Sequence, residues 1–427
     1  MMEKRFDKAT GESLYYKKHE SGLSIYIMPR AGYSSSYAIF GTRYGSVDSK
    51  FIVPGEDKVT EVPDGIAHYL EHKMFDQPDG RNVFDKFSRF GGNANAFTSF
   101  NMTAYLFSST DHFYDNLKTL LDYVQSPYFT KESVEKEQGI IGQEIKMYDD
   151  NAPWRVFFNL LGCLYVNHPV KLDIAGTVES ISRIDHELLY KCYNTFYNLS
   201  NMAIFVTGDF EPEEALAVIE SGIKKNEPFD EKIERIYPDE PDSIAKPYME
   251  QSISVAQPLF MMGWKDTDVG YGGERLMKKE IEMDILCEML FGKSTKLYNR
   301  LYSEGLINNS FSAEYNPQIA YAFTAIEGES PNPKKVFDEI LKELDKTELK
   351  QEDFDRIKKV CWGDYIRSFN DIEGYAHTFL TESFVDADYF DYARVFESVS
   401  FEDIKKRFEK HFVREHAALS VINPIKE

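Results

Sequence analysis

The chain has 427 residues and a formal net charge of −22 at pH 7. This length predicts two domains, each with a core of its own. The acidic charge disfavours nucleic acid and anionic membrane surfaces, and no apolar run approaches the roughly 18 residues that cross a bilayer. We therefore expect no nucleic-acid partner and no membrane association, whereas a basic peptide is compatible with the charge.

The N-terminus and the cysteines bear on the cellular compartment. The first eight residues are charged and lack the apolar segment of a secretory signal. The four cysteines are scattered without a Cys-x-x-Cys pair, which argues against a disulfide framework and against a thiolate metal site. These features predict a cytoplasmic protein with reduced cysteines.

The first half of the chain mixes short strand patterns with a helix pattern. Runs rich in β-branched and aromatic residues predict three strands, at Leu23–Met28, Tyr37–Gly41 and Ala104–Ser108. Before the third of these runs, Ala67, Leu70 and Met74 recur at helical spacing and give a short helix an apolar side. Asp64 is the residue expected to cap the start of that helix.

An internal repeat links the two halves. Residues Ile184–Tyr197 and Val399–Phe412 each predict an amphipathic helix. A strand follows each helix, at Ala203–Val206 and at Ala418–Val421, and the copies are offset by 215 positions, about half the chain. The shared order predicts a duplicated domain.

The division between the copies is expected near residue 240. Lys224–Pro247 is polar and contains four prolines, as is typical of a linker. After it come a predicted strand at Ser252–Gln257 and two predicted helices at Glu280–Leu290 and Phe337–Leu344.

The fold class expected from this order is α+β. We predict two similar domains, each a mostly antiparallel sheet with helices packed on it, that together enclose a cavity. The N-terminal domain, residues 1–240, would be catalytic and would bind zinc. The C-terminal domain, residues 241–427, would bind substrate or serve a structural role.

A candidate metal site lies in the first predicted helix. His68 and His72 are four residues apart, so both imidazoles face one side of the helix, and Glu71 shares that side. Zinc prefers nitrogen and oxygen ligands and keeps one position open for water in catalytic sites. A glutamate beside that water can act as general base, in the residue order called inverzincin. The alternative is a pair of packed or solvated histidines.

A second acidic pattern supports the site. Glu137 and Glu144 are seven residues apart, two helical turns, and share a face with Ile140 and Ile141. Carboxylates on a partly buried stripe need a compensating charge, which a cation would supply. The alternative is a solvated acidic helix face.

These residues resemble the motif of the pitrilysin family of zinc peptidases, also called the insulinase or mitochondrial processing peptidase family. The resemblance implies one zinc ion per chain with His68, His72 and Glu137 as its ligands. It also implies two catalytic residues, Glu71 as the base that activates water and Glu144 as support for the metal ligands.

The resemblance continues through Asn93–Ser99, Asn167–Pro169 and Ile174–Gly176. In the family, the strand at the first of these segments is an exposed edge that pairs with the substrate backbone. The resemblance therefore implies substrate binding by four residues, Asn95, Ala96, Phe97 and Thr98. Without it, an ordinary strand would be the simpler interpretation.

A bacterial subfamily is indicated by His72–Phe75 and by Leu301–Ile307. Many active relatives carry an arginine and a tyrosine, seven apart, around the glycine of the second segment. Aligning on Gly305 places Leu301 and Asn308 there instead, and aligning on Leu297 places Tyr302 at the arginine position, so neither alignment supplies the pair. We expect this segment to pack around a helix end.

Together these patterns predict a zinc-dependent endopeptidase of peptides or unfolded segments. The alternative from another class is a catalytically silent structural subunit, since the family includes subunits that bind partners without cleaving. The missing pair also predicts a heterodimer with a related chain that lacks the zinc motif, with a homodimer or a monomer as the other outcomes.

Overall fold

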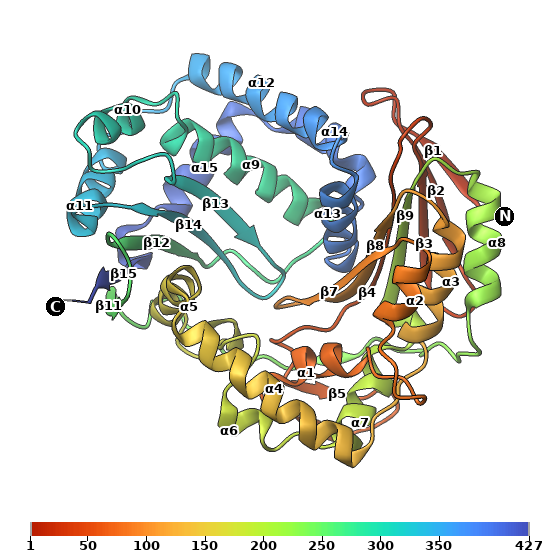
Figure 1. Ribbon diagram of the computed structural model, residues 1–427. Coiled ribbons are helices and arrows are strands. Elements are labelled where there is room, and N and C mark those ends of the chain that lie inside the picture. Colours follow the sequence, from red (N-terminus) through yellow and green to blue (C-terminus); the bar gives the residue numbers. More distant parts are fainter. Residues whose placement is uncertain (1, 426–427) are drawn as a thin grey trace. The chain divides into compact units, whose positions relative to one another are not determined.

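The computed structural model describes residues 2–425, which form two compact units (Figure 1). The first unit contains residues 2–145, 173–236 and 367–384, and the second contains 146–172, 237–366 and 385–425. Among the described residues, no helix is both long enough and apolar enough to span a membrane.

The first unit is built on a seven-stranded sheet of order β1-β2-β3-β9-β4-β8-β7. The β3–β9 pair is parallel and the other pairs are antiparallel. Its strands are β1 (Glu3–Phe6), β2 (Ser13–Lys18), β3 (Ser24–Pro29), β4 (Ser36–Thr42), β7 (Asn93–Thr98), β8 (Thr103–Ser109) and β9 (Met202–Gly208). A small second sheet joins β5 (Lys50–Ile52), β6 (Val59–Glu61) and β10 (Glu234–Arg235).

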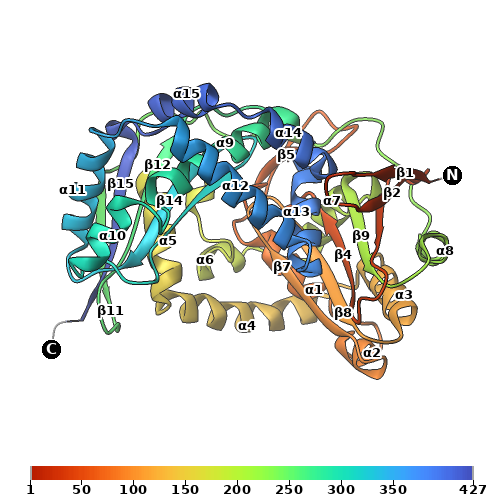
Figure 2. The same ribbon diagram turned by 90° about the horizontal axis from the view of Figure 1, so that it is seen from above.

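Helices cover both faces of this large sheet. On one face lie α3 and α8, which contact β3, β4 and β8, and on the other lies α13, which contacts β4 and β9 (Figure 2). Because neighbouring side chains of a strand point to opposite faces, Phe40 joins the core under α3 while Gly41 meets α13. The helices are α1 (Ile66–Lys73), α2 (Phe84–Arg89), α3 (Phe113–Val124), α4 (Lys131–Asp149), α6 (Val178–Ile181), α7 (His186–Phe196), α8 (Pro212–Gly222) and α13 (Ile372–Phe384).

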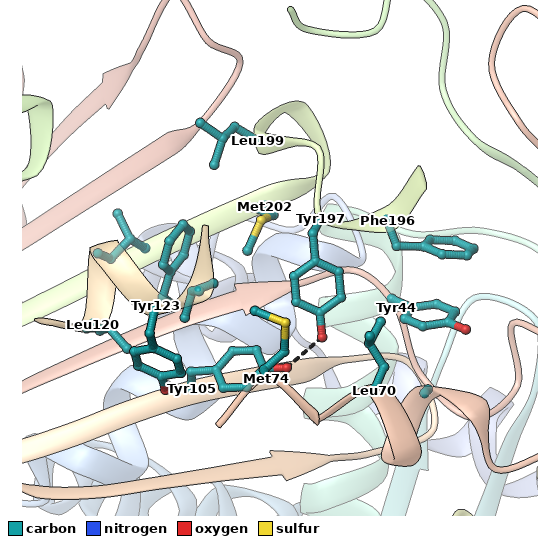
Figure 3. Packing of buried hydrophobic residues seen from close by; sticks show 14 of the residues in the cluster. Tyr44, Leu70, Met74, Tyr105, Leu120, Tyr123, Phe196, Tyr197, Leu199 and Met202 are labelled. Carbon is teal, nitrogen blue, oxygen red and sulfur yellow. Dashed lines mark hydrogen bonds between the residues drawn. The ribbon is translucent and has the colours of Figure 1, made fainter. Parts of the chain in front are cut away.

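The core of the first unit fixes α1 to the sheet. Leu70 of α1 and Met74, which follows the last residue of that helix, are fully buried beside aromatic rings of β8 and α7 (Figure 3). The hydroxyls of Tyr105 and Tyr197 lie 2.7 Å apart, so two buried phenols form a hydrogen bond in this core. The apolar side predicted for α1 from its spacing is therefore its buried side.

The second unit is built on a five-stranded sheet of order β11-β15-β12-β14-β13. Its strands are β11 (Tyr248–Ile253), β12 (Leu259–Asp266), β13 (Ser312–Pro317), β14 (Ala322–Glu329) and β15 (Ala417–Pro424). Its helices are α5 (Ala152–Leu164), α9 (Glu274–Phe291), α10 (Lys296–Ser303), α11 (Pro333–Leu344), α12 (Gln351–Ser368), α14 (Tyr392–Ser398) and α15 (Phe401–His411).

The two sheets share one topology, which confirms the predicted duplicated α+β fold. The order β3-β9-β4-β8-β7 in the first unit matches β11-β15-β12-β14-β13 in the second, including the single parallel pair. The predicted repeat consists of α7 with β9 and α15 with β15.

One expected strand is misplaced. The strand predicted at Ser252–Gln257 is β11, which begins earlier and ends at Ile253. Its last pairing partner on β15 is Pro424, and proline has no N–H to extend the ladder. The other predicted strands and helices fall on the elements described above.

The compact units differ from the continuous halves 1–240 and 241–427 in the short stretch 237–240, which belongs to the second unit, and in the placement of two helices. Helix α5, from the N-terminal half, packs on β11, β12 and β15 of the second unit. Helix α13, from the C-terminal half, packs on the sheet of the first unit. Each sheet is therefore covered on one face by a helix from the other half. The catalytic role predicted for residues 1–240 and the substrate-binding or structural role predicted for residues 241–427 stay predictions.

Candidate metal centre

The start of α1 is set by a close approach of two backbone segments. Gly65 precedes the helix with φ at 89°, and a Cβ there would lie 2.4 Å from the carbonyl oxygen of Ala175. A Cβ on Gly176 would lie 2.5 Å from the carbonyl oxygen of Asp64. The helix is capped by Gly65 without a side-chain hydrogen bond, so the prediction of Asp64 as its N-cap is wrong. The Ile174–Gly176 segment thus packs against the start of the metal-site helix.

Helix α4 is held beside α1 by two hydrogen bonds. The Tyr69 hydroxyl donates to the carbonyl of Val134, in the first turn of α4. Lys73, of which only 1% is exposed, donates to the carbonyl of Ser133 at 3.1 Å and pairs with Asp76. These contacts turn the acidic face of α4 toward the histidines of α1.

His68, His72 and Glu144 converge at this point. The Nε2 atom of His68 lies 3.7 Å from Oε1 of Glu144, and Nε2 of His72 lies 3.4 Å from Oε2. Their ligand atoms all lie within 4.8 Å of one another. In the part of the chain that the structure describes, this is the one group of three or more His, Cys, Asp or Glu residues with such geometry.

Glu137 occupies a different place. Its Oε1 atom lies 3.1 Å from Nδ1 of His72, the ring nitrogen away from the convergent group. A carboxylate on the second nitrogen of a metal-binding imidazole fixes the tautomer and orientation of that ring. The geometry therefore favours Glu144 as the third ligand and Glu137 as the partner of His72, the reverse of the sequence-based assignment.

Burial and the two glutamates shift the pKa values of the two histidines in opposite directions. Burial and the neighbouring His72 lower the pKa of His68 to about 4, so its ring is neutral at pH 7. Burial also acts to lower the pKa of His72, but hydrogen bonds with Glu137 and Glu144 raise it to about 10. Without an ion, the two carboxylates therefore hold a proton on His72.

Glu71 lies beside this group and is held from the neighbouring strand. The hydroxyl of Thr98, the last residue of β7, donates to Oε2 of Glu71 at 2.8 Å. Burial raises the pKa of Glu71, and the Thr98 hydrogen bond opposes that rise. No side-chain hydrogen bond reaches its Oε1 atom from the described residues.

The donor chemistry fits zinc. Two imidazole nitrogens and one carboxylate oxygen form the set of three protein ligands typical of catalytic zinc sites. A proton on Nδ1 of His72, donated to Glu137, would leave the Nε2 lone pair free for a metal.

Family models match both parts of the chain. Residues 58–178 match the model of insulinase, peptidase family M16, and residues 183–361 match the model of the peptidase M16 inactive domain. The uncharacterized zinc protease YmfH of Bacillus subtilis is 40% identical over 416 residues, covering 97% of each chain. The chain belongs to the insulinase family, M16.

Other relatives agree with this membership. The zinc protease PqqE of Helicobacter pylori is 25% identical and covers 93% of this chain and 91% of its own length. The crystal structure of an M16-like peptidase from Alicyclobacillus acidocaldarius is 35% identical, with a TM-score of 0.92 and 99% of each chain covered. A protease from Helicobacter pylori, 20% identical with a TM-score of 0.80, shares the fold.

In this M16 chain, the four predicted substrate-binding residues lie on β7, an edge of the large sheet. Ala96 packs on the core, and the backbone N–H of Ala96 donates to the exposed Asn95 side chain at 2.9 Å. The ring of Phe97 stacks on His377 of α13, with 5.0 Å between ring centroids and 19° between planes. Thr98 reaches Glu71 on the opposite face of the strand.

His377 is a residue that the sequence analysis missed. Its Nε2 atom lies 2.6 Å from the hydroxyl of Tyr37, and its ring covers Phe97. Some 280 residues separate His377 from β7 in the sequence, and it lies in no motif, so only the packing of α13 reveals it.

The segment Leu301–Ile307 packs as expected. Leu301, Leu306 and Ile307 are buried, and Gly305 follows the end of α10 with φ at 67°. Arg300 forms an ion pair with Glu339 at 2.8 Å.

Proposed function

We propose that this chain is a zinc-dependent endopeptidase that hydrolyses peptides or unfolded segments. The observation that carries the proposal is the convergence of His68, His72 and Glu144 beside Glu71. Relatives named as zinc proteases, across nearly the whole chain length, support the same chemistry.

In this proposal His68, His72 and Glu144 hold the metal. Glu137 keeps the His72 ring oriented through its hydrogen bond to Nδ1. Bound zinc supplies a Lewis acid at the site.

Glu71 is the proposed general base. Its Oε1 atom would accept a proton from the attacking water and pass that proton to the leaving amine of the cleaved bond. Burial raises the pKa of Glu71, which makes the carboxylate a better proton acceptor than an exposed glutamate.

The proposed substrate contact is the free edge of β7. An extended peptide that pairs with this edge is held by backbone hydrogen bonds, which allow varied sequences. With Asn95, Ala96, Phe97 and Thr98 on that strand, the scissile bond would lie close to Glu71. The net charge of −22 adds a preference for basic peptides.

The test is to measure zinc content and peptide hydrolysis on the same preparation. We expect one zinc per chain, cleavage of peptides from a mixed library, loss of cleavage after chelation and its return with added zinc. Stoichiometric zinc without cleavage of any peptide, alone or with a partner, would favour the silent structural subunit instead.

We also propose a partner, a related chain that lacks the His-x-x-Glu-His motif. This part rests on the missing arginine and tyrosine near Gly305. Contacts to a transition state are worth about 3–4 kcal/mol, so the chain alone should cleave hundreds of times more slowly than the assembled pair. Adding such a chain from the same organism should accelerate hydrolysis. If this chain is fully active alone and does not bind the related chain, the heterodimer is ruled out, and the homodimer and the monomer remain.

A further inference from the structure

Strand β7 directs its last side chain at the candidate base. Ala94 and Ala96 pack on the core that includes α1, so Thr98, two residues further, points to the same side. Phe97 points to the opposite side, where it meets His377. The pairing of Thr98 with Thr103 of β8 fixes the position of the Thr98 hydroxyl next to α1.

The hydrogen bonds around Thr98 determine which acceptor receives its hydroxyl proton. The Thr103 hydroxyl donates to the carbonyl of Tyr44 at 2.9 Å, so its one proton is already used. The Thr98 hydroxyl lies 3.3 Å from that of Thr103 but 2.8 Å from Oε2 of Glu71. A shorter bond to a carboxylate is also the stronger one. Thr98 therefore donates to Glu71.

The side chain of Thr98 has little freedom to leave this position. Its β-branched carbon restricts χ1, and its backbone is paired with β8. Glu71 lies in the last turn of α1, a helix whose start is fixed by Gly65. Both ends of the hydrogen bond thus belong to rigid elements, as an oriented catalytic group requires.

We propose that Thr98 is a positioning residue that holds one carboxylate oxygen of Glu71, so that the other oxygen faces the water and the substrate. This inference rests on the proposed function. It gives Thr98 a task distinct from the backbone pairing that its place on the edge strand implies, because the task belongs to its hydroxyl.

The experiment compares Thr98→Val, which removes the hydroxyl at nearly constant shape, with Thr98→Ser, which keeps it. Thr98→Val should lower kcat roughly 10- to 100-fold, the loss of one hydrogen bond to a charged group, with KM and zinc content unchanged. Thr98→Ser should stay within about threefold of wild type. The measurements are steady-state hydrolysis of a quenched peptide and metal analysis.

Thr42→Val is the matched control. Thr42 lies in the same sheet and donates a buried hydroxyl hydrogen bond to the carbonyl of Phe196, away from Glu71. It should lower stability without lowering kcat. Thr98→Ala is a second variant without the hydroxyl and should match Thr98→Val.

The results separate this inference from the proposed function. Full kcat in both Thr98→Val and Thr98→Ala, with Glu71→Gln inactive, overturns the inference and leaves the function standing. Equal losses of kcat in Thr98→Val and Thr98→Ser also overturn the inference. So does a loss of kcat in Thr98→Val that is accounted for by a matching loss of bound zinc. A wild-type protein that holds zinc and cleaves nothing overturns both.

Discussion

The two units share one sheet topology but differ in the arrangement of their buried polar groups. In the first unit, α1 lies beside the edge strand β7 and brings His68, Glu71 and His72 to a partly open site. In the second unit, α9 lies beside the equivalent edge strand β13 and contains no histidine. The polar residues near that strand are instead sealed in a network of their own.

That network is centred on Asp266. Its Oδ2 atom accepts from the Tyr315 hydroxyl at 2.7 Å, lies 2.9 Å from the Lys279 ammonium and lies 3.3 Å from Nδ1 of His411. The far nitrogen of His411 meets the Thr324 hydroxyl at 2.6 Å. In this network the carboxylate of Asp266 is paired with a buried ammonium and accepts from a phenol, whereas in the first unit the carboxylates of Glu137 and Glu144 lie against the rings of His68 and His72.

The largest expected effect concerns Glu71 in the candidate metal centre. Glu71→Gln should lower turnover by about three orders of magnitude or more, because it removes the proton acceptor. Zinc content should stay unchanged. Burial raises the pKa of Glu71, which means that its charge costs stability at neutral pH, so the variant should unfold at the same temperature or higher.

The control for this variant lies on α9. Glu288→Gln also removes a half-buried carboxylate from the helix beside an edge strand, and it should leave zinc content unchanged. Hydrolysis at the wild-type rate by zinc-loaded Glu71→Gln would refute the role of Glu71.

A substitution in the Asp266 network should lower stability and leave zinc binding unchanged. Asp266→Asn should lower stability by about 3–5 kcal/mol, because it leaves the buried Lys279 ammonium without its carboxylate. Zinc affinity should not change. Thermal unfolding together with metal titration measures both quantities, and a variant that loses zinc but not stability would contradict the comparison.

The pH dependence of that loss has a defined sign. Burial raises the pKa of Asp266, but its contacts with His411 and Lys279 outweigh this and hold the pKa below its usual 3.8. The contribution of the ionised group is therefore present above about pH 4 and lost as the pH falls below it. The stability gap between wild type and Asp266→Asn should shrink over that range.

Substitutions on α4 should rank the two glutamates. Glu144→Gln should deplete zinc, because it removes a ligand, whereas Glu137→Gln should weaken affinity by roughly 10- to 100-fold, because it only frees the His72 ring. Glu135→Gln, on the exposed face of α4, is the control and should not change affinity. The reverse ranking would restore Glu137 as the ligand.

The smallest expected effect concerns α13. His377→Gln should destabilise the first unit by about 1–2 kcal/mol, because the Tyr37 hydroxyl loses its partner and Phe97 loses its stacked ring. A double-mutant cycle with Tyr37→Phe measures the coupling. Strictly additive effects would show that the 2.6 Å contact contributes nothing.

Much of the fold follows from local patterns. The apolar spacing of α1, the strands β3, β4 and β8, and the repeat of α7–β9 in α15–β15 are all evident in the sequence. The helix start is different, because Gly65 is required by the nearby Ala175 carbonyl, a contact that no local pattern encodes.

The candidate site was predictable in its members but not in their roles. A spacing of seven places Glu137 and Glu144 on one face of α4 equally well. Which of them meets both histidines depends on where α4 crosses α1, and that is set by the Tyr69 and Lys73 hydrogen bonds. Thr98 was predicted as a substrate-binding residue of the strand, and its hydroxyl contact with Glu71 required the register with β8.

The exchange of α5 and α13 bears on how the protein would respond to proteolysis. A cut in the segment between Lys224 and Pro247 would give two fragments, yet each sheet would still be covered by a helix that belongs to the other fragment. We expect the nicked protein to migrate as one species under native conditions and as two under denaturing ones. A fragment of residues 1–240 expressed alone would lack Phe379 and Leu380 and would expose the apolar sheet face beneath them. Supplying the missing half in trans should restore its solubility, because α13 of that half would cover the exposed sheet face.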